Sequence, residues 1–573
     1  MVYFTSKYPL PPPVPDANIH ELMFNTPTLT GEPVPDHDLH IDIITGRKRT
    51  FYEFKELIRD GATALGAPVS QGGLGLSGQK GDIVAIYSHN CMDYIALVHS
   101  LLIITTPIAL FSAYGTPFEL AHAMRTCRPT KLFVQPSLLP NALAAAKENG
   151  LSEDDVFILE GKVQGKRSFQ DLVDAVKARA IPRVPIRPAS KTTLAYLVFS
   201  SGTTGLPKGV MISHGNLWSL MYTQVVQKEE EDKVYKPQPP AKPPVQLVFL
   251  PFHHTYGFHM ACFRFFTNPM TYLIIPKWDV ELVLRAIPKY RVNVMALVPS
   301  AIHQIVHHPL TSKIDWSSVL QVGSGAAHLP PELSQSFMRY LKNAPLMSEG
   351  YGMSEQTLSA ARRPLPGVLG GIKPKPGSPG ILLPGMEGRI VRADGSEADY
   401  DEPGELWTRG GNIALGYWNN EKATKETFVD GWLRTGDHFK IDRDGFLFFV
   451  DRAKDTLKVG GAQVSPTEVE EALLAQPDKL IKDVCVAGVT GGRTSDEKNP
   501  RAWIVLSESG ETRGGRETIE ALDQWARKTL SRYKWLRGGY EVVDQIPKSP
   551  TGKVLRRVLQ EQYEQRIAAQ PKL

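Results

Sequence analysis

The sequence predicts an α/β protein, because short apolar strands alternate with helix-length segments over about the first 345 residues. Six apolar runs are predicted to form strands: 81–88, 131–136, 245–251, 270–277, 292–300 and 319–325. The run at 91–104 has helical spacing and follows the first of these strands. Apolar strands that alternate with helices favour parallel sheets covered on both faces.

The character of the sequence changes after about Pro364, where short strands at 388–395, 404–410 and 445–451 are separated by turns. This pattern predicts a small β subdomain. The tail from about 455 to 573 is predicted to form an α/β unit of its own. Its first helix, 466–476, begins with Pro466 and carries the capping box of Ser465 and Glu468.

One segment, residues 228–244, differs from the rest of the chain in composition. Residues 228–244 are charged and then rich in proline, so we expect an exposed, mobile loop there that buries no core.

Composition excludes several classes of protein. Of 573 residues, 42% are hydrophobic and 22% charged, which argues against disorder and coiled coil. The 65 basic and 60 acidic residues give a net charge of +5, too dilute on a chain of this size to indicate nucleic-acid binding. The most apolar run, 98–114, is too short and too polar to span a membrane, and is expected to form a buried helix and strand. The four cysteines, Cys91, Cys127, Cys262 and Cys485, are too far apart for a disulfide framework or a zinc site.

A glycine-rich loop, SSGTTGLPKGV (200–210), follows the apolar strand TTLAYLVF and precedes a helical run that starts near Ser213. Its backbone N–H groups, its hydroxyls and the ammonium of Lys208 suit the binding of phosphates. It is not a Walker loop, because the lysine precedes its glycine. This loop resembles the phosphate-binding loop of the adenylate-forming superfamily, which includes acyl-CoA synthetases and 4-coumarate–CoA ligases. Further motifs of that superfamily follow in the same order: PFHHTYGF (251–258), GSGAAH (323–328), EGYGMSE (349–355), LRTGDHF (433–439), VDRAKD (450–455) and PKSPTGKVLRR (547–557).

The resemblance implies a particular domain organisation. We expect a large N-terminal domain, residues 1–451, made of two packed doubly wound α/β subdomains and a small β subdomain. A hinge at 452–455, with Lys454 at its centre, would join it to a small mobile domain at 456–573.

The resemblance also implies a site for ATP and Mg²⁺. Asp437 and Arg452 would bind the ribose, and Glu355 would hold Mg²⁺, a hard cation that prefers carboxylate and phosphate oxygens. The other residues expected at the nucleotide are Ser200, Ser201, Gly202, Thr203, Thr204, Gly205 and Lys208 at the phosphates, Gly325, Ala326, Ala327, Tyr351 and Gly352 at the adenine, and Ser354 at the α-phosphate.

By the same resemblance, His254 would sense the carboxylate and the α-phosphate, and Lys553 would be the catalytic lysine of adenylation. The acyl group would lie against Tyr256, Gly323 and Gly350. Coenzyme A would approach along Lys458, Gly460 and Gly461. The remaining histidines give no metal site: His253 and His259 lack a carboxylate or cysteine partner, and 303–308 is an ordinary helix face.

The expected function is an ATP-dependent acyl-CoA ligase that works through an acyl-adenylate. Its acid would be aryl or a medium or long acyl chain, and an amino acid is disfavoured because 253–258 lacks a carboxylate. The alternatives are an adenylating enzyme with a carrier protein or oxygen as acceptor, and an inactive nucleotide-binding protein. The last residues, Pro571, Lys572 and Leu573, are similar to the peroxisomal Ser-Lys-Leu signal apart from the proline, so we expect a peroxisomal location and otherwise a cytoplasmic one.

Overall fold

The computed structural model of the chain describes residues 3–25, 34–200, 207–235, 242–264, 269–327, 329–344, 347–452, 457–459, 462–490, 498–530, 532–549, 552 and 554–569. Its contacts divide the chain into two compact units. The larger unit contains 4–388 and 408–434, and the smaller contains 1–3, 389–407 and 435–573. The boundary at 451 and the hinge at 452–455 remain predictions.

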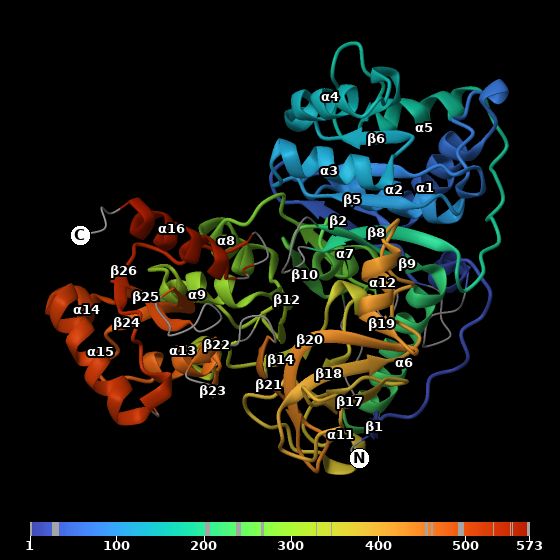
Figure 1. Cartoon of the computed structure of the whole chain (residues 1–573). Coiled ribbons are helices and arrows are strands. Elements are labelled where there is room, and N and C mark those ends of the chain that lie inside the picture. The colour runs from blue at the N-terminus through green and yellow to red at the C-terminus, as the bar shows by residue number, and fades with distance from the viewer. Residues whose placement is uncertain are drawn as a thin grey trace. The chain divides into compact units, whose positions relative to one another are not determined.

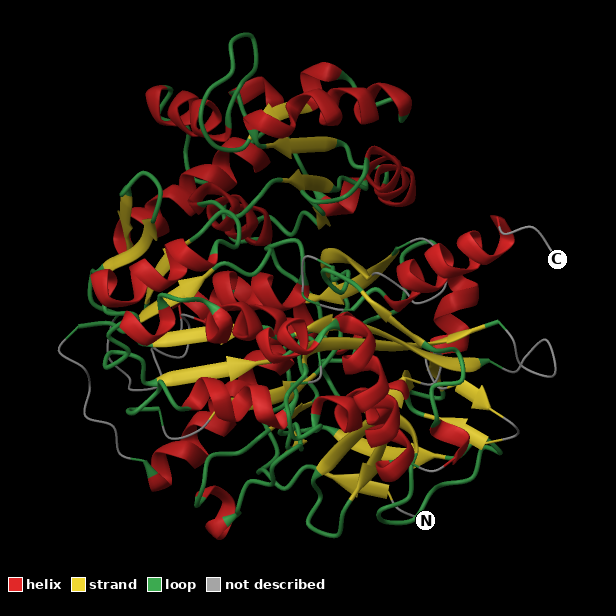
Figure 2. Cartoon of the chain, turned by 90° about the vertical axis from the view of Figure 1, so that its left-hand side faces the viewer, coloured by secondary structure: helices red, strands yellow, loops and turns green. Residues whose placement is uncertain are grey.

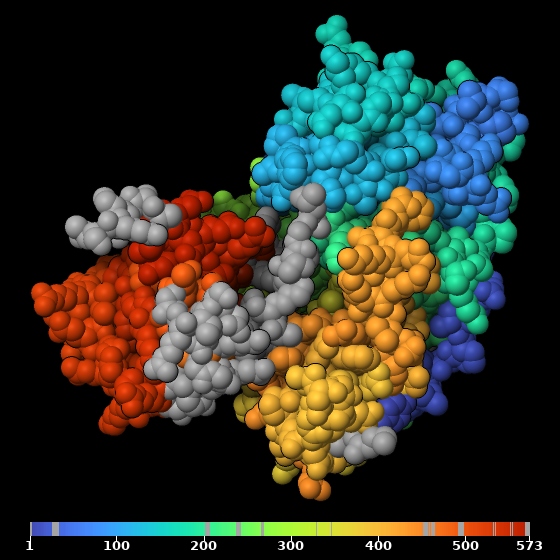
Figure 3. Space-filling view, viewed as in Figure 1, coloured from blue at the N-terminus to red at the C-terminus, as the bar shows by residue number. Residues whose placement is uncertain are grey.

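The first sheet of the larger unit is parallel except for its last strand. In Figure 1 the helices α3 and α4 lie beside it, and Figure 2 shows its strands, at the top of the view, with helices on both sides. The light-blue and cyan residues, which include β4 to β7 of this sheet, form one continuous surface in Figure 3. The strand order is β7 (Val156–Ile158), β6 (Lys131–Val134), β4 (Val84–Tyr87), β5 (Ile108–Phe111), β8 (Leu194–Ser200) and β9 (Lys208–Ser213).

The second sheet of the larger unit has nine strands, and its central strands are parallel, as the alternation of apolar strands and helices predicts. The antiparallel pairs lie at its two ends. The strand order is β16 (Ile381–Leu382), β15 (Ala361–Arg362), β14 (Met347–Tyr351), β13 (Gln321–Ser324), β12 (Val294–Leu297), β10 (Val245–Val248), β11 (Thr271–Ile274), β2 (Asp38–Asp42) and β3 (Lys48–Thr50).

The two sheets share one hydrophobic core, which includes Ile86 of β4 and Tyr272 of β11. All twelve residues of α2 are buried, so this helix is covered on every side, and its nearly all-apolar sequence is the reason it tolerates that position. The helices of the larger unit are α1 (Phe51–Gly66), α2 (Met92–Ile103), α3 (Pro117–Cys127), α4 (Leu139–Glu148), α5 (Phe169–Ala178), α6 (His214–Val234), α7 (Thr255–Cys262), α8 (Val280–Tyr290), α9 (Pro299–His307), α10 (Pro331–Met338), α11 (Val368–Gly371) and α12 (Glu421–Thr427).

The turn-rich part of the chain forms short strands, as predicted. Strand β20 pairs antiparallel with β19 near its start and with β21 over its second half. The strands of this part are β17 (Glu387–Val391), β18 (Gly404–Arg409), β19 (Phe428–Val429), β20 (Trp432–Ile441) and β21 (Leu447–Arg452), and β1 (Tyr3–Thr5) begins the described chain.

The C-terminal part is an α/β unit, also as predicted. Ser465 caps its first helix by accepting a hydrogen bond from the Glu468 amide at 3.3 Å, with Pro466 at the first helical position. Its elements are the hairpin β22 (Leu457–Val459) and β23 (Ala462–Val464), the sheet β24 (Ile481–Val489), β25 (Asn499–Leu506) and β26 (Tyr540–Val542), and the helices α13 (Pro466–Leu474), α14 (Glu508–Arg513), α15 (Gly515–Thr529) and α16 (Arg556–Ala569).

The expectation of a loop at 228–244 is wrong for its first part. Residues 228–234 continue helix α6, where Lys228 pairs with Asp232 and Lys233 with the buried Glu230. Charged residues spaced three and four apart stabilise a helix, and the sequence prediction gave this spacing too little weight. Residues 236–241 lie outside the described part of the chain.

All four cysteines are buried and free. Among the described residues, none of the helices has the length and apolar character that a membrane span requires.

A partly buried ion pair anchors helix α16 to the rest of its unit. Arg556 donates from Nη2 to both carboxylate oxygens of Glu470, at 2.8 and 2.9 Å, and from Nε to the Val486 carbonyl. Burial raises the pKa of Glu470, and the Arg556 guanidinium opposes that rise. The guanidinium therefore favours the charged form of a carboxylate that burial by itself disfavours.

We predict that Arg556→Met destabilises the protein by about 2 kcal/mol at about pH 8, because it leaves a partly buried carboxylate without its hydrogen-bonded counter-charge. Without Arg556 the pKa of Glu470 rises further. The loss should shrink as the pH falls through that raised pKa, since protonated Glu470 needs no counter-charge. Chemical denaturation at several pH values measures both effects.

The matched control is Arg557→Met, because Arg557 is exposed and forms an i,i+4 pair with Glu561. Its loss should be below about 0.5 kcal/mol at every pH. Equal losses for the two variants would contradict the prediction.

Candidate active site

The glycine-rich loop connects two antiparallel strands. Ser200 ends β8, Lys208 begins β9, and the two residues are opposite one another in the register. The helical run predicted to start near Ser213 is confirmed, since α6 begins at His214 after the cap Ser213. Residues 208–213 before it form a strand that the sequence analysis did not predict. Val210 and Ile212 are buried in this strand, and Met211 between them is partly exposed. Five predicted phosphate contacts lie outside the described residues: Ser201, Gly202, Thr203, Thr204 and Gly205.

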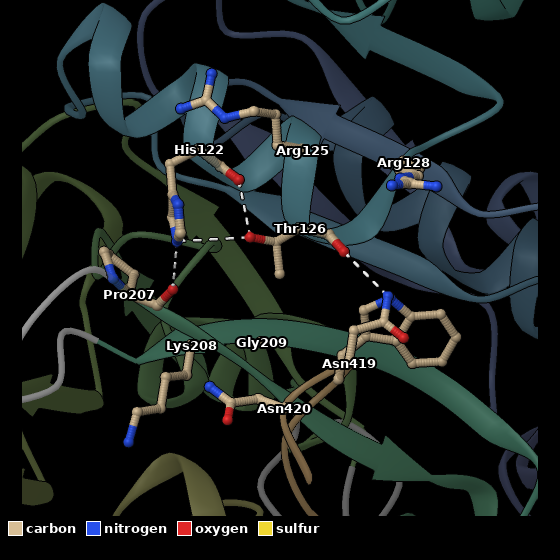
Figure 4. Close-up of a pocket in the computed structure, with 10 residues that line it drawn as sticks. His122, Arg125, Thr126, Arg128, Pro207, Lys208, Gly209, Asn419 and Asn420 are labelled. Atoms are coloured by element: carbon tan, nitrogen blue, oxygen red, sulfur yellow. Dashed lines mark hydrogen bonds between the residues drawn. The ribbon is translucent and has the colours of Figure 1, made fainter. Parts of the chain in front are cut away.

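A histidine that sequence reasoning missed holds the end of this loop. His122 of α3 donates from Nε2 to the Pro207 carbonyl at 2.9 Å. A pocket of about 650 Å³ lies at this contact, lined by residues that include Arg125, Arg128 and Asn419. In Figure 4 the side chain of Lys208 points away from His122.

The ammonium of Lys208 instead lies 4.8 Å from the centre of the Tyr417 ring, a cation–π distance. The hydroxyl of Tyr417 donates to Glu355 Oε1 at 2.8 Å, and the Ala414 amide donates to the Glu355 carbonyl at 2.9 Å. Burial, followed by the charge of Glu355, raises the pKa of Tyr417, so its hydroxyl stays a donor. Tyr417 therefore links three segments that are far apart in the sequence, since its ring contacts Lys208 and its hydroxyl contacts the Glu355 carboxylate.

Tyr417 was also missed by sequence reasoning. The signal that could have found it is the Gly416-Tyr417 pair in GYWNN, where Gly416 has a φ of +135° that favours glycine.

A second contact joins two of the predicted motifs. Thr255 Oγ1 donates to Ser354 Oγ at 3.0 Å, which ties HHTYGF to EGYGMSE. His254 is the N-cap of α7, and its Nδ1 accepts from the Tyr256 amide at 3.4 Å. The imidazole is thereby placed at the start of a helix and beside the Thr255–Ser354 contact.

The backbone around the expected adenine site is tightly constrained. Ala326 has a φ of +70°, a left-handed conformation that is strained for a residue with a side chain and is found mostly where function requires it. At Gly352 a Cβ atom would lie 2.0 Å from the Leu358 carbonyl oxygen, so only glycine fits. Tyr351, at the end of β14, is partly exposed, and Ala327 follows Ala326 in the same turn.

The structure brings the predicted acyl-pocket residues together. A Cβ atom at Gly323 would lie 3.8 Å from the Tyr256 hydroxyl, and one at Gly325 would lie 3.6 Å from its ring. A Cβ atom at Gly325 would also lie 3.7 Å from the Gly350 carbonyl oxygen. Burial raises the pKa of Tyr256 to about 12. Because Gly323 and Gly325 have no side chains, there is room beside a neutral tyrosine.

The smaller unit carries the expected ribose residues. Asp437 of β20 and Arg452 of β21 are paired in the antiparallel register, and Asp437 is buried. The two residues were predicted from separate motifs, and the strand pairing places them opposite each other.

The remaining predicted residues of the smaller unit are only partly described. Lys458 lies on β22, and Lys454, Gly460, Gly461 and Lys553 lie outside the described residues. The segment that carries Lys553 is anchored before and after by ion pairs, Lys548 with Asp483 and Arg556 with Glu470.

Glu355 fits the role of a magnesium ligand that completes its coordination with phosphate oxygens and water. It is a buried carboxylate, 5% exposed, and it is oriented by the Tyr417 hydroxyl. No group of three or more potential ligating side chains occurs within the ranges that the structure describes, so a cage made of protein alone is not indicated there.

We predict that Tyr417→Phe weakens the binding of MgATP about tenfold, because the carboxylate of Glu355 loses the donor that orients it. Isothermal titration calorimetry with MgATP measures the effect. Tyr235→Phe is the matched control, since Tyr235 donates to the Pro366 carbonyl at 2.7 Å from an exposed position. Equal affinities for the two variants would contradict the orienting role.

Comparison with known proteins finds matches over nearly the whole chain. The AMP-binding enzyme family matches residues 32–418, and its C-terminal domain matches residues 468–553. A probable 4-coumarate–CoA ligase of Dictyostelium discoideum is 32% identical over 98% of this chain and 97% of its own. An acyl-CoA ligase of Alternaria alternata is 30% identical over 84% of this chain and 83% of its own.

Solved structures share the fold. An anthranilate–CoA ligase in complex with anthranoyl-AMP has a TM-score of 0.79 at 22% identity and covers 97% of this chain and 99% of its own. ATP-bound MatB from Rhodopseudomonas palustris has a TM-score of 0.77 at 24% identity and covers 96% of this chain and 99% of its own. With both family domains matched and relatives aligned over nearly their whole length, the chain belongs to the AMP-binding enzyme family.

Proposed function

We propose that the chain activates a carboxylic acid with ATP to an acyl-adenylate and pyrophosphate, and then transfers the acyl group to the thiol of coenzyme A with release of AMP. The observation that carries the proposal is the convergence on Glu355 and Ser354 of the loop end at Lys208, the helix start at Thr255 and the segment at Tyr417. Relatives that align over nearly the whole chain are named CoA ligases, which supports coenzyme A as the acceptor.

Adenylation solves a chemical problem. A carboxylate is a poor acyl donor, because its leaving group would be oxide, and attack on the α-phosphate of ATP replaces that oxide with AMP. The attack brings two anions together, so the site must hold positive charge and N–H donors where negative charge accumulates.

In the larger unit, Lys208 and the loop that begins at Ser200 would bind the triphosphate. Glu355 would hold Mg²⁺, which when bound neutralises phosphate charge. His254 would donate toward the carboxylate and the α-phosphate, and the contact of Thr255 with Ser354 keeps that imidazole and the α-phosphate site in register. Tyr351 would stack on the adenine against the turn of Gly325 to Ala327.

The smaller unit would serve both half-reactions. Asp437 would accept from the ribose hydroxyls, and Arg452 would lie beside it. Lys553 would neutralise the carboxylate and the α-phosphate during adenylation. A rotation about Lys454 would then withdraw Lys553 and present Lys458, Gly460 and Gly461 to the thiol, a known mode of domain switching.

Two acceptors other than coenzyme A, a carrier protein and oxygen, are less favoured because of the names of the relatives. An assay with ATP, Mg²⁺, coenzyme A and a panel of aryl and aliphatic acids separates them by mass spectrometry. An acyl-CoA formed with stoichiometric AMP supports the proposal. Pyrophosphate release without thioester would overturn coenzyme A as the acceptor.

We predict that Lys553→Ala abolishes adenylate formation but largely spares thioester formation from supplied acyl-AMP, because the lysine charge is needed only while two anions meet. Lys528→Ala, at an exposed lysine of α15, is the matched control and should leave both half-reactions unchanged. Equal loss of both half-reactions in Lys553→Ala would contradict the use of two faces of the smaller unit.

We also propose that the chain is peroxisomal, on the similarity of Pro571-Lys572-Leu573 to a peroxisomal signal. A fluorescent fusion that ends in these residues should co-localise with a peroxisomal marker, and deletion of the tripeptide should release it. An unchanged distribution after the deletion would contradict the proposal.

A further inference from the structure

The loop that joins β14 to β15 carries Ser354 and Glu355, the residues expected at the α-phosphate and at Mg²⁺. A single turn of 3-10 helix, Ser354–Gln356, begins this loop, and Thr357 ends the turn with a φ of +62° and a ψ of −42°. The Leu358 amide donates across Thr357 to the Gln356 carbonyl at 2.6 Å. A hydrogen bond between residues two apart, with positive φ at the residue between them, defines a γ-turn of the rare and strained kind.

A threonine is an unexpected residue at the centre of this turn. A positive φ crowds the side chain against the backbone, and a β-branched side chain suffers most from this crowding. Glycine adopts the same conformation without a steric penalty. Strained backbone persists only where the surrounding structure holds it, and it is found mostly at functional sites.

Asn412 holds the turn from outside the loop. Thr357 Oγ1 donates to the Asn412 carbonyl at 2.5 Å. In return, Asn412 Nδ2 donates to the carbonyls of Gln356 and Ser359, at 3.0 and 2.9 Å. Thr357 is fully buried and Asn412 is 2% exposed, so water does not compete for these bonds. The γ-turn is therefore tied to Asn412 through its central residue and on both sides of that residue.

The segment that contains Asn412 also holds Glu355. The Ala414 amide donates to the Glu355 carbonyl, and the Tyr417 hydroxyl donates to its carboxylate. Glu355 is two residues before Thr357, so the direction of its backbone depends on the γ-turn as well as on these two bonds. Ser354 is held separately, by its contact with Thr255.

We propose that Thr357 is a positioning residue, whose strained γ-turn, held by Asn412, preorganises the carboxylate of Glu355 as a ligand of the Mg²⁺ that accompanies ATP. This inference rests on the proposed ligase function and adds a residue that lies outside the EGYGMSE motif. A preorganised ligand loses less conformational freedom on binding, so it binds more tightly. No bond is made or broken at Thr357.

The test uses Thr357→Gly in the full chain, because glycine removes both the strain and the hydroxyl bond. Isothermal titration calorimetry should show an affinity for MgATP about tenfold lower than that of the wild-type protein. The affinity for AMP in EDTA should be unchanged, since Thr255 holds Ser354. The melting temperature should stay within about 3 °C, because the relief of strain offsets the lost bond. A purely structural role would instead weaken the binding of MgATP and AMP alike.

Thr105→Gly is the matched control. Thr105 is another buried threonine with a positive φ, +48°, and it precedes β5, away from Glu355 in the sequence and in the printed contacts. This variant should leave the affinity for MgATP unchanged. Thr357→Ser keeps the hydroxyl that bonds to Asn412, so it should retain most of the wild-type affinity.

Asn412→Ala releases the turn from the other side and should also weaken the binding of MgATP about tenfold while sparing AMP. This variant keeps the proposal falsifiable if Thr357→Gly fails to fold, which thermal unfolding will show. Wild-type affinity for MgATP in both variants would overturn the inference, and so would equal losses for MgATP and AMP. Both results leave the ligase function standing if the wild-type protein still releases AMP with an acid. A wild-type protein that binds no MgATP would overturn the inference together with the proposed function.

Discussion

The carboxylate of Glu355 is buried in a part of the larger unit where segments from three regions of the sequence meet. A buried carboxylate is expensive unless hydrogen bonds or a cation compensate it. The Tyr417 hydroxyl supplies one such bond, and the ring of the same tyrosine lies under the Lys208 ammonium. Tyr417, in the segment after β18, therefore holds both Lys208 at the end of the glycine-rich loop and the magnesium candidate Glu355 in place.

The second sheet explains why the other motifs reach the same place. Strands β10, β12, β13 and β14 are neighbours and parallel, so the segments that follow them leave from one edge of the sheet. HHTYGF follows β10, the turn of Gly325 to Ala327 follows β13, and Tyr351 ends β14. Ligand sites in open α/β sheets are commonly at the carboxyl ends of parallel strands. The bond between Thr255 and Ser354 joins two of these strand ends directly.

The two ends of strand β13 carry different kinds of side chain. Along β13, the nucleotide end is defined by small residues and a strained turn at Ala326, and the far end by Gln321 and Arg264. Small residues leave room for a ligand beside Tyr256.

Much of this protein is determined by the sequence alone. Apolar runs of strand length alternate with amphipathic segments. A continuous apolar run indicates a strand that is buried on both faces, and such strands are typical of parallel sheets. The cap at Ser465 and the ordered motifs from the glycine-rich loop to PKSPTGKVLRR are equally local.

The tertiary structure decided the contacts between residues far apart in the sequence, which no local sequence pattern predicts. Contacts with distant residues determine several features. They are the strand at 208–213, the bond of Tyr417 to Glu355, the bond of His122 to Pro207 and the position of Arg264 beside Gln321. Tyr417 is 62 residues from Glu355, His122 is 85 from Pro207, and Arg264 is 57 from Gln321. Periodicity reports which side of an element is buried, but a hydrogen bond between distant segments exists only after the sheets have packed, and only packing decides which partner is within reach.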